Sequence, residues 1–374
     1  MSNARTLQLL YRNNFKSFYR LAFRHAFEGK RLLDNWHIDH LLGVLNDCLE
    51  GKTTRAIINA PPRHSKSFLA SVAYPLFALG QNPSLKIMVL TANKELALEL
   101  ESLARRIMGS NQMPAVFAHL AAIARQPKLR LSTGGELSYG VFGKPIVGRG
   151  IDIVIIDDPI SPDDALNDRF RTDVNEWFKS DLLPRISDRS SNVIVVAMQR
   201  LHPDDLTGML LRSKGEYRHC EFAAIARKDE QWPMPDGSTY TRRKGEVLHP
   251  DKMSREQLLT TLDQMGAVQF SAQYQQDPSI RKETRTGHYF LREYDQSYYD
   301  TWTPESGIEQ WAICLVPEVD ILRFELFGEG PPPPEPYVPR LTEAQWEQAA
   351  ILQQRRLVES MKEGGSTSLP FTAA

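Results

Sequence analysis

The sequence predicts an α/β fold: a mainly parallel sheet flanked by helices. One observation is a series of apolar runs of strand length that alternate with helical patterns, at residues 56–58, 86–91, 153–156 and 192–199. A second is that these runs are continuous rather than alternating, which is typical of parallel strands buried on both faces. The chain has 374 residues and is 41% hydrophobic, which is enough for a sizeable core and for more than one domain.

Composition narrows the class of protein. A net charge of −1 gives no overall sign of a nucleic-acid binder, so DNA contacts would come from local patches. The cysteines Cys48, Cys220 and Cys314 are far apart and form no C-x-x-C pair, so we expect reduced thiols in a cytoplasmic protein. Neither a membrane-spanning run nor a signal-peptide core is found, and we expect a protein that stays in the cell that makes it.

The N-terminal stretch predicts two helices. Residues 7–26 carry apolar side chains at helical spacing with basic residues between them, and a solvated basic face is favoured over a DNA or partner contact. Trp36 and His37 open a second helical stripe that runs to Leu49. His37 and His40 lie three residues apart, but the pair alone does not make a metal site. A more specific alternative for this segment is that its aromatic side chain packs against a nucleotide base.

The first strand leads directly into a candidate phosphate-binding loop. Residues 55–67 read RAIINAPPRHSKS, and Lys66-Ser67 open a helix. In such a loop backbone N–H groups cradle phosphates, the lysine reaches the β- and γ-phosphates, and the hydroxyl binds Mg²⁺. Ala60 and Ser65 stand where the usual loop has glycines. An ordinary strand-to-helix turn therefore stays open as the alternative.

The segment after the loop continues the alternation of helix and strand. Residues 68–79 predict a helix that Pro75 should kink or end, and residues 94–108 predict an amphipathic helix. Residues 113–127 are weakly patterned, and residues 129–147 have the glycine spacing of short strands with turns.

Paired acids end the strand at residues 153–156. Asp157 and Asp158 follow it directly, and Pro159 stops the strand. Such a pair places one acid beside Mg²⁺ and leaves the other to orient an attacking water, although it could instead cap the next helix. Because the acids follow the Lys-Ser loop in the expected order, the two signals together favour nucleotide hydrolysis.

Polar residues also end the strand at residues 192–199. Gln199 and Arg200 follow this strand, and ligands of open α/β sheets bind at the carboxyl ends of the strands. Both are therefore site candidates. Residues 177–183 read as helical, and Asp204-Asp205 are expected to begin a short helix.

Together these segments resemble a known family. APPRHSKS, LTANKELALELESLARRIM, VGRGIDIVIIDDP and VAMQRLHPDDLTGMLL, in that order, are similar to the ATPase domain of the large terminase subunit of tailed bacteriophages and prophages. The resemblance covers residues 36–290 and includes GAVQFSAQYQQDP. It implies a RecA/ASCE-like P-loop NTPase that uses ATP and Mg²⁺ to move double-stranded DNA into a procapsid. It also implies a homo-oligomeric ring in the host cytoplasm, away from membranes, with a portal protein and a small terminase subunit as partners.

The resemblance also implies roles for individual residues. The loop Arg63-His64-Ser65-Lys66-Ser67 would hold the phosphates, with Ser67 and Asp157 on the Mg²⁺ side. Asp158, where many relatives have glutamate, would position the water, and Arg149 would reach the γ-phosphate of a neighbouring subunit. The motif that couples the nucleotide site to DNA would contain Gln199 and Arg200, and the adenine contact would come from Trp36 and His37.

We divide the chain into a basic helical arm (1–34), a P-loop ATPase domain (35–225), a joining segment (226–295) and an irregular tail (296–374). The family's nuclease domain is not recognised in the tail. Asp300 follows no buried strand, and Asp320 and Glu325 near the strand-like runs 311–316 and 321–327 do not match its order. A proline-rich linker and a polar helix at 342–362 complete the tail.

We therefore expect a packaging-type ATPase without its own nuclease, from a truncated or frame-shifted gene or with the nuclease on another chain. The alternatives are another P-loop DNA translocase or helicase, and a non-catalytic prophage remnant.

Overall fold

The computed structural model describes residues 3–145, 150–186, 191–213, 215–278, 289–293, 311–315, 322–323 and 326–328. The chain divides into two compact units, one made of Met1–Arg255 with Ser271–Ser279 and the other of Glu256–Phe270 with Ile280–Ala374. Within the described ranges, no helix is both long and apolar enough to cross a membrane.

A seven-stranded sheet organises the described part of the first unit, with strand order β3-β4-β2-β5-β6-β1-β7. Every neighbouring pair is parallel except β3 with β4. The strands are β1 (Arg55–Asn59), β2 (Lys86–Thr91), β3 (Leu129–Arg130), β4 (Glu136–Val141), β5 (Ile153–Asp157), β6 (Val193–Met198) and β7 (Arg218–Glu221). β6 lies between β1 and β5, as in RecA/ASCE-like P-loop NTPases, so the predicted fold class is confirmed.

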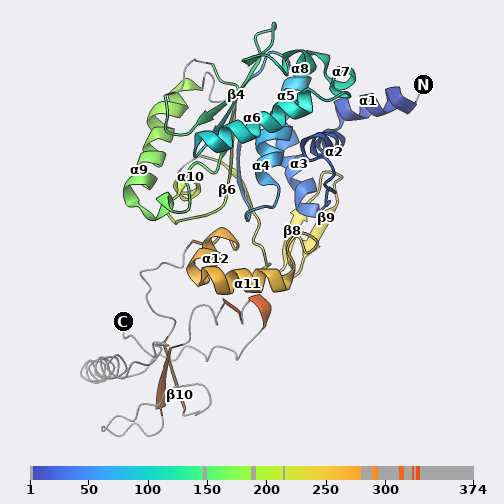
Figure 1. Cartoon of the computed structure of the whole chain (residues 1–374). Coiled ribbons are helices and arrows are strands. Elements are labelled where there is room, and N and C mark those ends of the chain that lie inside the picture. The colour runs from blue at the N-terminus through green and yellow to red at the C-terminus, as the bar shows by residue number, and fades with distance from the viewer. Residues whose placement is uncertain are drawn as a thin grey trace. The chain divides into compact units, whose positions relative to one another are not determined.

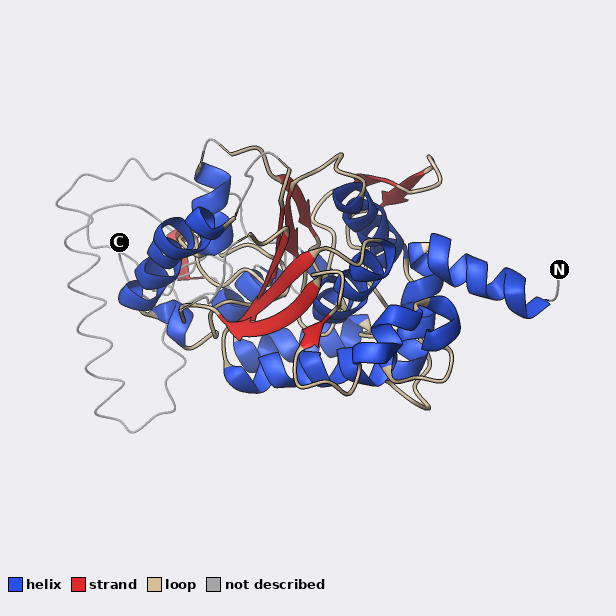
Figure 2. Cartoon of the chain, turned by 90° about the horizontal axis from the view of Figure 1, so that it is seen from above, coloured by secondary structure: helices blue, strands red, loops and turns tan. Residues whose placement is uncertain are grey.

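Helices cover both faces of this sheet (Figures 1 and 2). In β5, Ile153 and Ile155 join one hydrophobic cluster while Val154 and Ile156 join the other, because successive side chains of a strand point to opposite faces. The first cluster contains residues of α2 (Phe15–Ala26), α3 (Trp36–Leu49), α5 (Tyr74–Gln81) and α6 (Lys94–Met108), and the second contains residues of α10 (Leu206–Arg212). This two-sided burial explains the continuous apolar runs.

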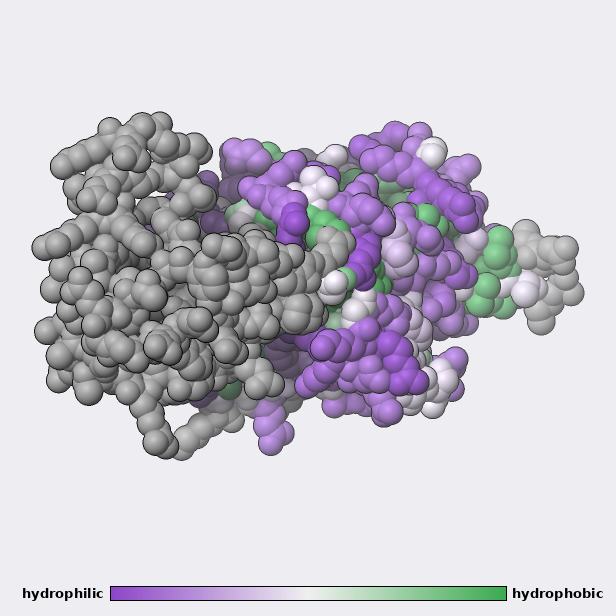
Figure 3. Space-filling model, turned by 90° about the horizontal axis from the view of Figure 1, so that it is seen from below, coloured by the Kyte–Doolittle hydropathy of each residue, from purple (hydrophilic) through white to green (hydrophobic). Residues whose placement is uncertain are grey.

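The prediction of one continuous helix over residues 7–26 is wrong, because the helix is interrupted at Asn14. The chain forms α1 (Asn3–Asn13) and α2, and the Asn14 side chain accepts a hydrogen bond from Ser17 N, so it caps α2 and breaks the run. The predicted arm belongs to the core of the first unit, since Phe18 and Tyr19 of α2 are buried. α1 instead exposes Leu7, Leu9 and Leu10, and Figure 3 shows apolar side chains gathered near the N-terminal end.

The helix after the candidate loop is irregular, as Pro75 predicts. A run of helical residues begins with α4 (Lys66–Phe68), passes through a π-helical turn (Leu69–Ala73) and continues as α5. Pro75 lies in the first turn of α5, where its missing N–H costs least. The π-helical turn just before it takes up the change in hydrogen bonding.

The other elements of the first unit are short. The weakly patterned stretch 113–127 contains α7 (Met113–Val116) and α8 (Ala118–Ile123). The helical stretch expected at 177–183 begins earlier, as α9 (Asp168–Trp177), followed by a π-helical turn (Phe178–Leu182) and a 3₁₀ turn (Leu183–Arg185). The first unit also contains a 3₁₀ turn (Asp164–Leu166) and an antiparallel hairpin of β8 (Glu230–Pro233) and β9 (Thr239–Arg242).

The second unit is described in part. α11 (Arg255–Met265) and α12 (Ala267–Gln273) span its boundaries in the sequence, and β10 (Tyr289–Glu293) pairs antiparallel with β11 (Trp311–Leu315). The strand expected at 311–316 is confirmed. The strand expected at 321–327 is wrong, since the residues described there are helical. Asp300, Asp320, Glu325 and the expected helix at 342–362 lie outside the described residues.

Candidate nucleotide site

Strand pairing brings the predicted polar segments to one edge of the sheet. Asn59 at the end of β1 pairs with Met198 of β6, and Asp157 at the end of β5 pairs with Ala197. The loop after β1, the acids at the end of β5 and the polar residues after β6 therefore meet at the carboxyl ends of three adjacent parallel strands. This edge is where open α/β sheets bind their ligands.

The candidate loop has the backbone of a glycine-containing turn without the glycines. Ser65 has φ 67° and Arg63 has φ 64°, both in the left-handed region that favours glycine. Such a conformation costs a non-glycine residue about 1–3 kcal/mol, which the surrounding structure must offset. Ser65 thus departs from the usual sequence of a phosphate-binding loop while its backbone keeps the conformation that glycine would adopt.

Lys66 is buried beneath this loop and ion-paired. Its Nζ lies 2.6 Å from Asp158 Oδ2, and its side chain is 6% exposed. Burial alone would lower the pKa of Lys66, but the nearby Asp158 and Asp157 carboxylates outweigh this effect and raise it. The lysine is therefore a fixed positive charge at the carboxyl edge of the sheet.

Asp157 is a buried carboxylate that two serine hydroxyls hold in place. Its Oδ1 accepts a hydrogen bond from Ser67 Oγ and its Oδ2 accepts one from Ser71 Oγ, each at 2.9 Å. Burial, reinforced by repulsion from Asp158, raises the pKa of Asp157 to about 6. The hydroxyl and carboxylate oxygens brought together here are of the type that Mg²⁺ prefers, so Ser67 and Asp157 fit the predicted ion.

Asp158 connects the loop to β6. Its backbone has φ 42°, its Oδ2 accepts from Lys66, and its Oδ1 accepts from the backbone N–H of Gln199 at 3.0 Å. Because both carboxylate oxygens are engaged with site residues, the structure does not show the helix cap that was the alternative for this acid. Gln199 Oε1 is buried and has no hydrogen-bond partner among the described residues.

The Arg200 side chain forms a buried ion pair with Asp205. Its Nε donates to both Asp205 carboxylate oxygens, at 3.2 and 3.0 Å, and Asp205 also caps α10 by accepting from Gly208 N. The Arg200 backbone N–H donates to Gln276 Oε1. The structure therefore brings Gln199 to the acids, whereas the Arg200 guanidinium holds the turn between β6 and α10.

Trp36 and His37, the residues predicted to contact adenine, are packed against protein side chains, and His37 lies beside His64 of the loop. Trp36 stacks on Tyr240, with ring centroids 4.6 Å apart and planes inclined by 11°, and it also packs against Trp232. His37 is fully buried, and its Nδ1 lies 2.6 Å from Asn35 Oδ1. Neither residue lines the cavity beside the loop.

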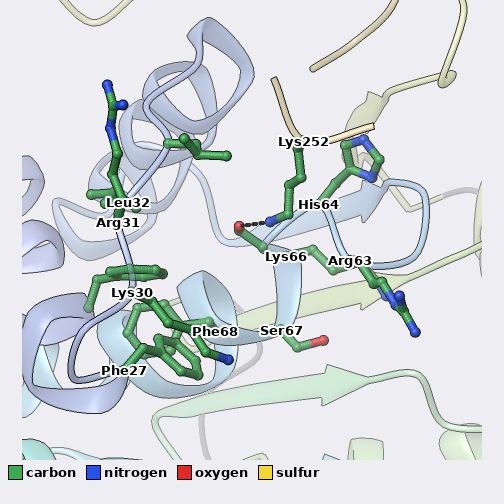
Figure 4. Close-up of a pocket in the computed structure, with 13 residues that line it drawn as sticks. Phe27, Lys30, Arg31, Leu32, Arg63, His64, Lys66, Ser67, Phe68 and Lys252 are labelled. Atoms are coloured by element: carbon green, nitrogen blue, oxygen red, sulfur yellow. Dashed lines mark hydrogen bonds between the residues drawn. The ribbon is translucent and has the colours of Figure 1, made fainter. Parts of the chain in front are cut away.

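A cavity of about 400 Å³ lies beside the candidate loop (Figure 4). Its lining contains five cationic residues, one histidine and no carboxylate among the described residues. The lining residues are Phe23, Phe27, Lys30, Arg31, Leu32, Leu33, Arg63, His64, Ser65, Lys66, Ser67, Phe68 and Lys252. A cavity with this charge is suited to an anion such as a polyphosphate, and its phenylalanine side chains offer faces for a base.

Sequence reasoning found the loop residues of this cavity and missed the others. The residues from Phe23 to Leu33 belong to the segment that the sequence predicts as a basic arm, and the adjacent Lys30 and Arg31 are the signal in it that indicates an anion site. Lys252 is far away in the sequence and follows no recognisable motif. Arg149 lies outside the described residues, and the described ranges contain no group of three or more metal-ligating side chains.

The topology and this site define the fold of a P-loop NTPase. The chain is similar to the crystal structure of the HK97 bacteriophage large terminase, with a TM-score of 0.46 and 14% sequence identity over 76% of this chain. The similarity spans 61% of the terminase chain. No protein-family model matches the sequence, and neither does any curated protein.

Proposed function

We propose that this protein hydrolyses ATP with Mg²⁺ and couples hydrolysis to the movement of double-stranded DNA, as a motor of the large-terminase type. The observation that carries the proposal is the direct contact of four predicted residues at one sheet edge. Lys66 is bonded to Asp158, and Ser67 is bonded to Asp157. Because these bonds join residues about 90 positions apart in the sequence, the agreement with the motif order does not depend on local pattern.

The contacts support a mechanism in which phosphate replaces a carboxylate. Lys66 would exchange Asp158 for the β- and γ-phosphate oxygens, which are also anionic hydrogen-bond acceptors. Asp158, released from the lysine but still held by Gln199 N, would then accept a hydrogen bond from the attacking water. Ser67 and Asp157 would hold Mg²⁺, which neutralises charge on the phosphates.

The DNA-moving part of the proposal comes from the order of the four family-like segments. A portal protein, a small terminase subunit and a ring of identical subunits are proposed as partners on the same basis. Arg149 would complete the active site of a neighbouring subunit in such a ring. We also propose that this chain has no nuclease activity of its own, because its tail lacks the family's pattern of strands ending in acids.

ATP hydrolysis by the purified protein, measured with Mg²⁺ or EDTA and with or without linear double-stranded DNA, tests the function. Hydrolysis that needs Mg²⁺ and rises with DNA supports the motor, and single-stranded DNA in parallel separates a helicase from a duplex translocase. Nucleotide binding without turnover under all conditions would support the non-catalytic remnant.

A second assay tests the nuclease part of the proposal. Supercoiled and linear DNA are incubated with the protein in Mg²⁺ or Mn²⁺, and we expect no cleavage. Cleavage that is lost in an Asp320→Asn or Glu325→Gln variant would show that the tail contains a nuclease site.

A further inference from the structure

Lys252 is a second lysine in contact with the candidate phosphate loop. Its Nζ donates a hydrogen bond to Ser65 Oγ at 3.0 Å, drawn as the dashed line in Figure 4. The two residues are 187 positions apart in the sequence. Lys252 also lines the same cavity as Lys66 and Arg63, so its ammonium group faces the space that the phosphates would occupy.

The backbone around Lys252 is held in place by a turn anchored on a buried histidine. The His249 carbonyl accepts hydrogen bonds from the N–H groups of both Lys252 and Met253, each at 3.0 Å. The His249 side chain is 1% exposed and packs against His37 and His64, with ring centroids 5.5 and 6.4 Å away. The backbone of Lys252 is therefore part of a hydrogen-bonded turn, and this turn packs beside the loop through the His249 side chain.

The partners of the two lysines differ in a way that matters for anion binding. Lys66 is neutralised by the Asp158 carboxylate, whereas Lys252 donates to a neutral hydroxyl, that of Ser65. No ion pair of Lys252 occurs within the described ranges of the chain. Since exchanging a neutral acceptor for a phosphate oxygen strengthens an ammonium hydrogen bond, Lys252 gains more from a bound polyphosphate than Lys66 does.

We propose that Lys252 is a second phosphate-binding lysine of this site and that its hydrogen bond to Ser65 Oγ is replaced by one to a nucleotide phosphate. This inference rests on the proposed function and extends it, because it names a contact from outside the family-like loop. It also assigns a role to Ser65, whose hydroxyl holds the Lys252 ammonium at the cavity in a way that glycine could not.

Equilibrium binding of ATP to the full chain, measured by calorimetry, tests the proposal. The proteins are the wild type, Lys252→Gln, Lys252→Arg and the control Lys244→Gln, which removes the same charge from an exposed residue outside the cavity lining. Loss of a charged hydrogen bond weakens binding roughly 10- to 100-fold, so we expect that change in Kd for ATP with Lys252→Gln. Lys252→Arg should retain most of the affinity, and the control should match the wild type.

Titration with adenosine separates a phosphate contact from a general disturbance of the pocket. Adenosine affinity should be the same for the wild type and Lys252→Gln, and thermal melting should confirm that the variant is folded. Wild-type protein that binds no ATP would overturn the proposed function. Wild-type protein that binds ATP with a Kd unchanged in folded Lys252→Gln would overturn the role of Lys252 alone, and equal loss of ATP and adenosine binding would show that Lys252 only shapes the pocket.

Discussion

Lys66 Nζ and Asp158 Oδ2 lie 2.6 Å apart in an ion pair with the lysine side chain almost fully buried. The residue predicted to bind phosphate is thus held by the residue predicted to orient water. Phosphate binding would have to break this pair, so the free energy of nucleotide binding is reduced by the strength of the lysine–aspartate contact. The same exchange would release Asp158 when nucleotide is bound.

Substitutions of the two partners should have opposite effects on ATP affinity. Asp158→Asn removes the competing charge, so ATP should bind several-fold more tightly while turnover falls at least about 10²-fold, because a neutral amide is a much weaker proton acceptor for the water than a carboxylate. Lys66→Ala should lose both binding and turnover, with the fold intact by circular dichroism. Kd from calorimetry and kcat from phosphate release measure the two effects, with exposed Lys94→Ala as the control. Weaker ATP binding by Asp158→Asn would contradict the exchange.

Ser65 should be strained by its left-handed backbone. Ser65→Gly and Ser65→Ala both lose the hydroxyl, but only glycine adopts φ 67° without a Cβ clash. The glycine variant should therefore be more stable than the alanine variant by about 1 kcal/mol in urea unfolding. Equal stability of the two variants would show that the left-handed conformation is not enforced at this position.

The raised pKa of Asp157 predicts a pH dependence of stability. The folded protein binds this proton more tightly than the unfolded chain does, because the pKa rises from 3.8 to about 6 on folding. The wild type should therefore lose stability relative to Asp157→Asn as the pH rises through this window. Melting temperatures from pH 4 to 7.5 in EDTA measure the difference, with exposed Asp163→Asn as the control. A difference that shrinks with rising pH would refute the raised pKa.

The buried Arg200–Asp205 pair predicts a structural role for Arg200. Removing the arginine leaves a carboxylate that is 0% exposed without its charge partner, so Arg200→Ala should destabilise the protein by about 3–5 kcal/mol. Arg212→Ala, which breaks an ion pair of two exposed side chains with Asp204, should cost less than about 1 kcal/mol. Urea unfolding compares them. An Arg200→Ala protein with normal stability but little ATP turnover would support the site role predicted from the sequence instead.

Arg149 should act across a subunit boundary. If it reaches the γ-phosphate of a neighbour, Arg149→Ala should lower turnover by about 10³-fold or more with little loss of ATP affinity. Mixing Arg149→Ala with Asp158→Ala should restore part of the activity, because a mixed ring contains some intact composite sites. Turnover is measured over a range of mixing ratios, after cross-linking has shown that the variants co-assemble. Absence of rescue would assign the arginine to its own subunit or to no catalytic role.

The sequence by itself determined the strands and the chemistry at their ends. The run 153–156 followed by two acids, and the run 56–58 followed by the Lys-Ser loop, are local patterns. Strands buried on both faces are apolar at nearly every position, and in these two runs the polar residues follow where the strand leaves the core. The pairing of Lys66 with Asp158 follows once these strand ends share an edge.

Tertiary structure alone decided which side chains from distant segments became partners. Nothing in the local pattern places β6 between β1 and β5, attaches Arg200 to Asp205, or stacks Trp36 on Tyr240. The contact of Lys252 with Ser65 is of the same kind, since it depends on how the segment after β9 packs against the loop. Local propensity specifies where an element begins and ends, whereas the neighbours of a side chain depend on the packing of the whole core.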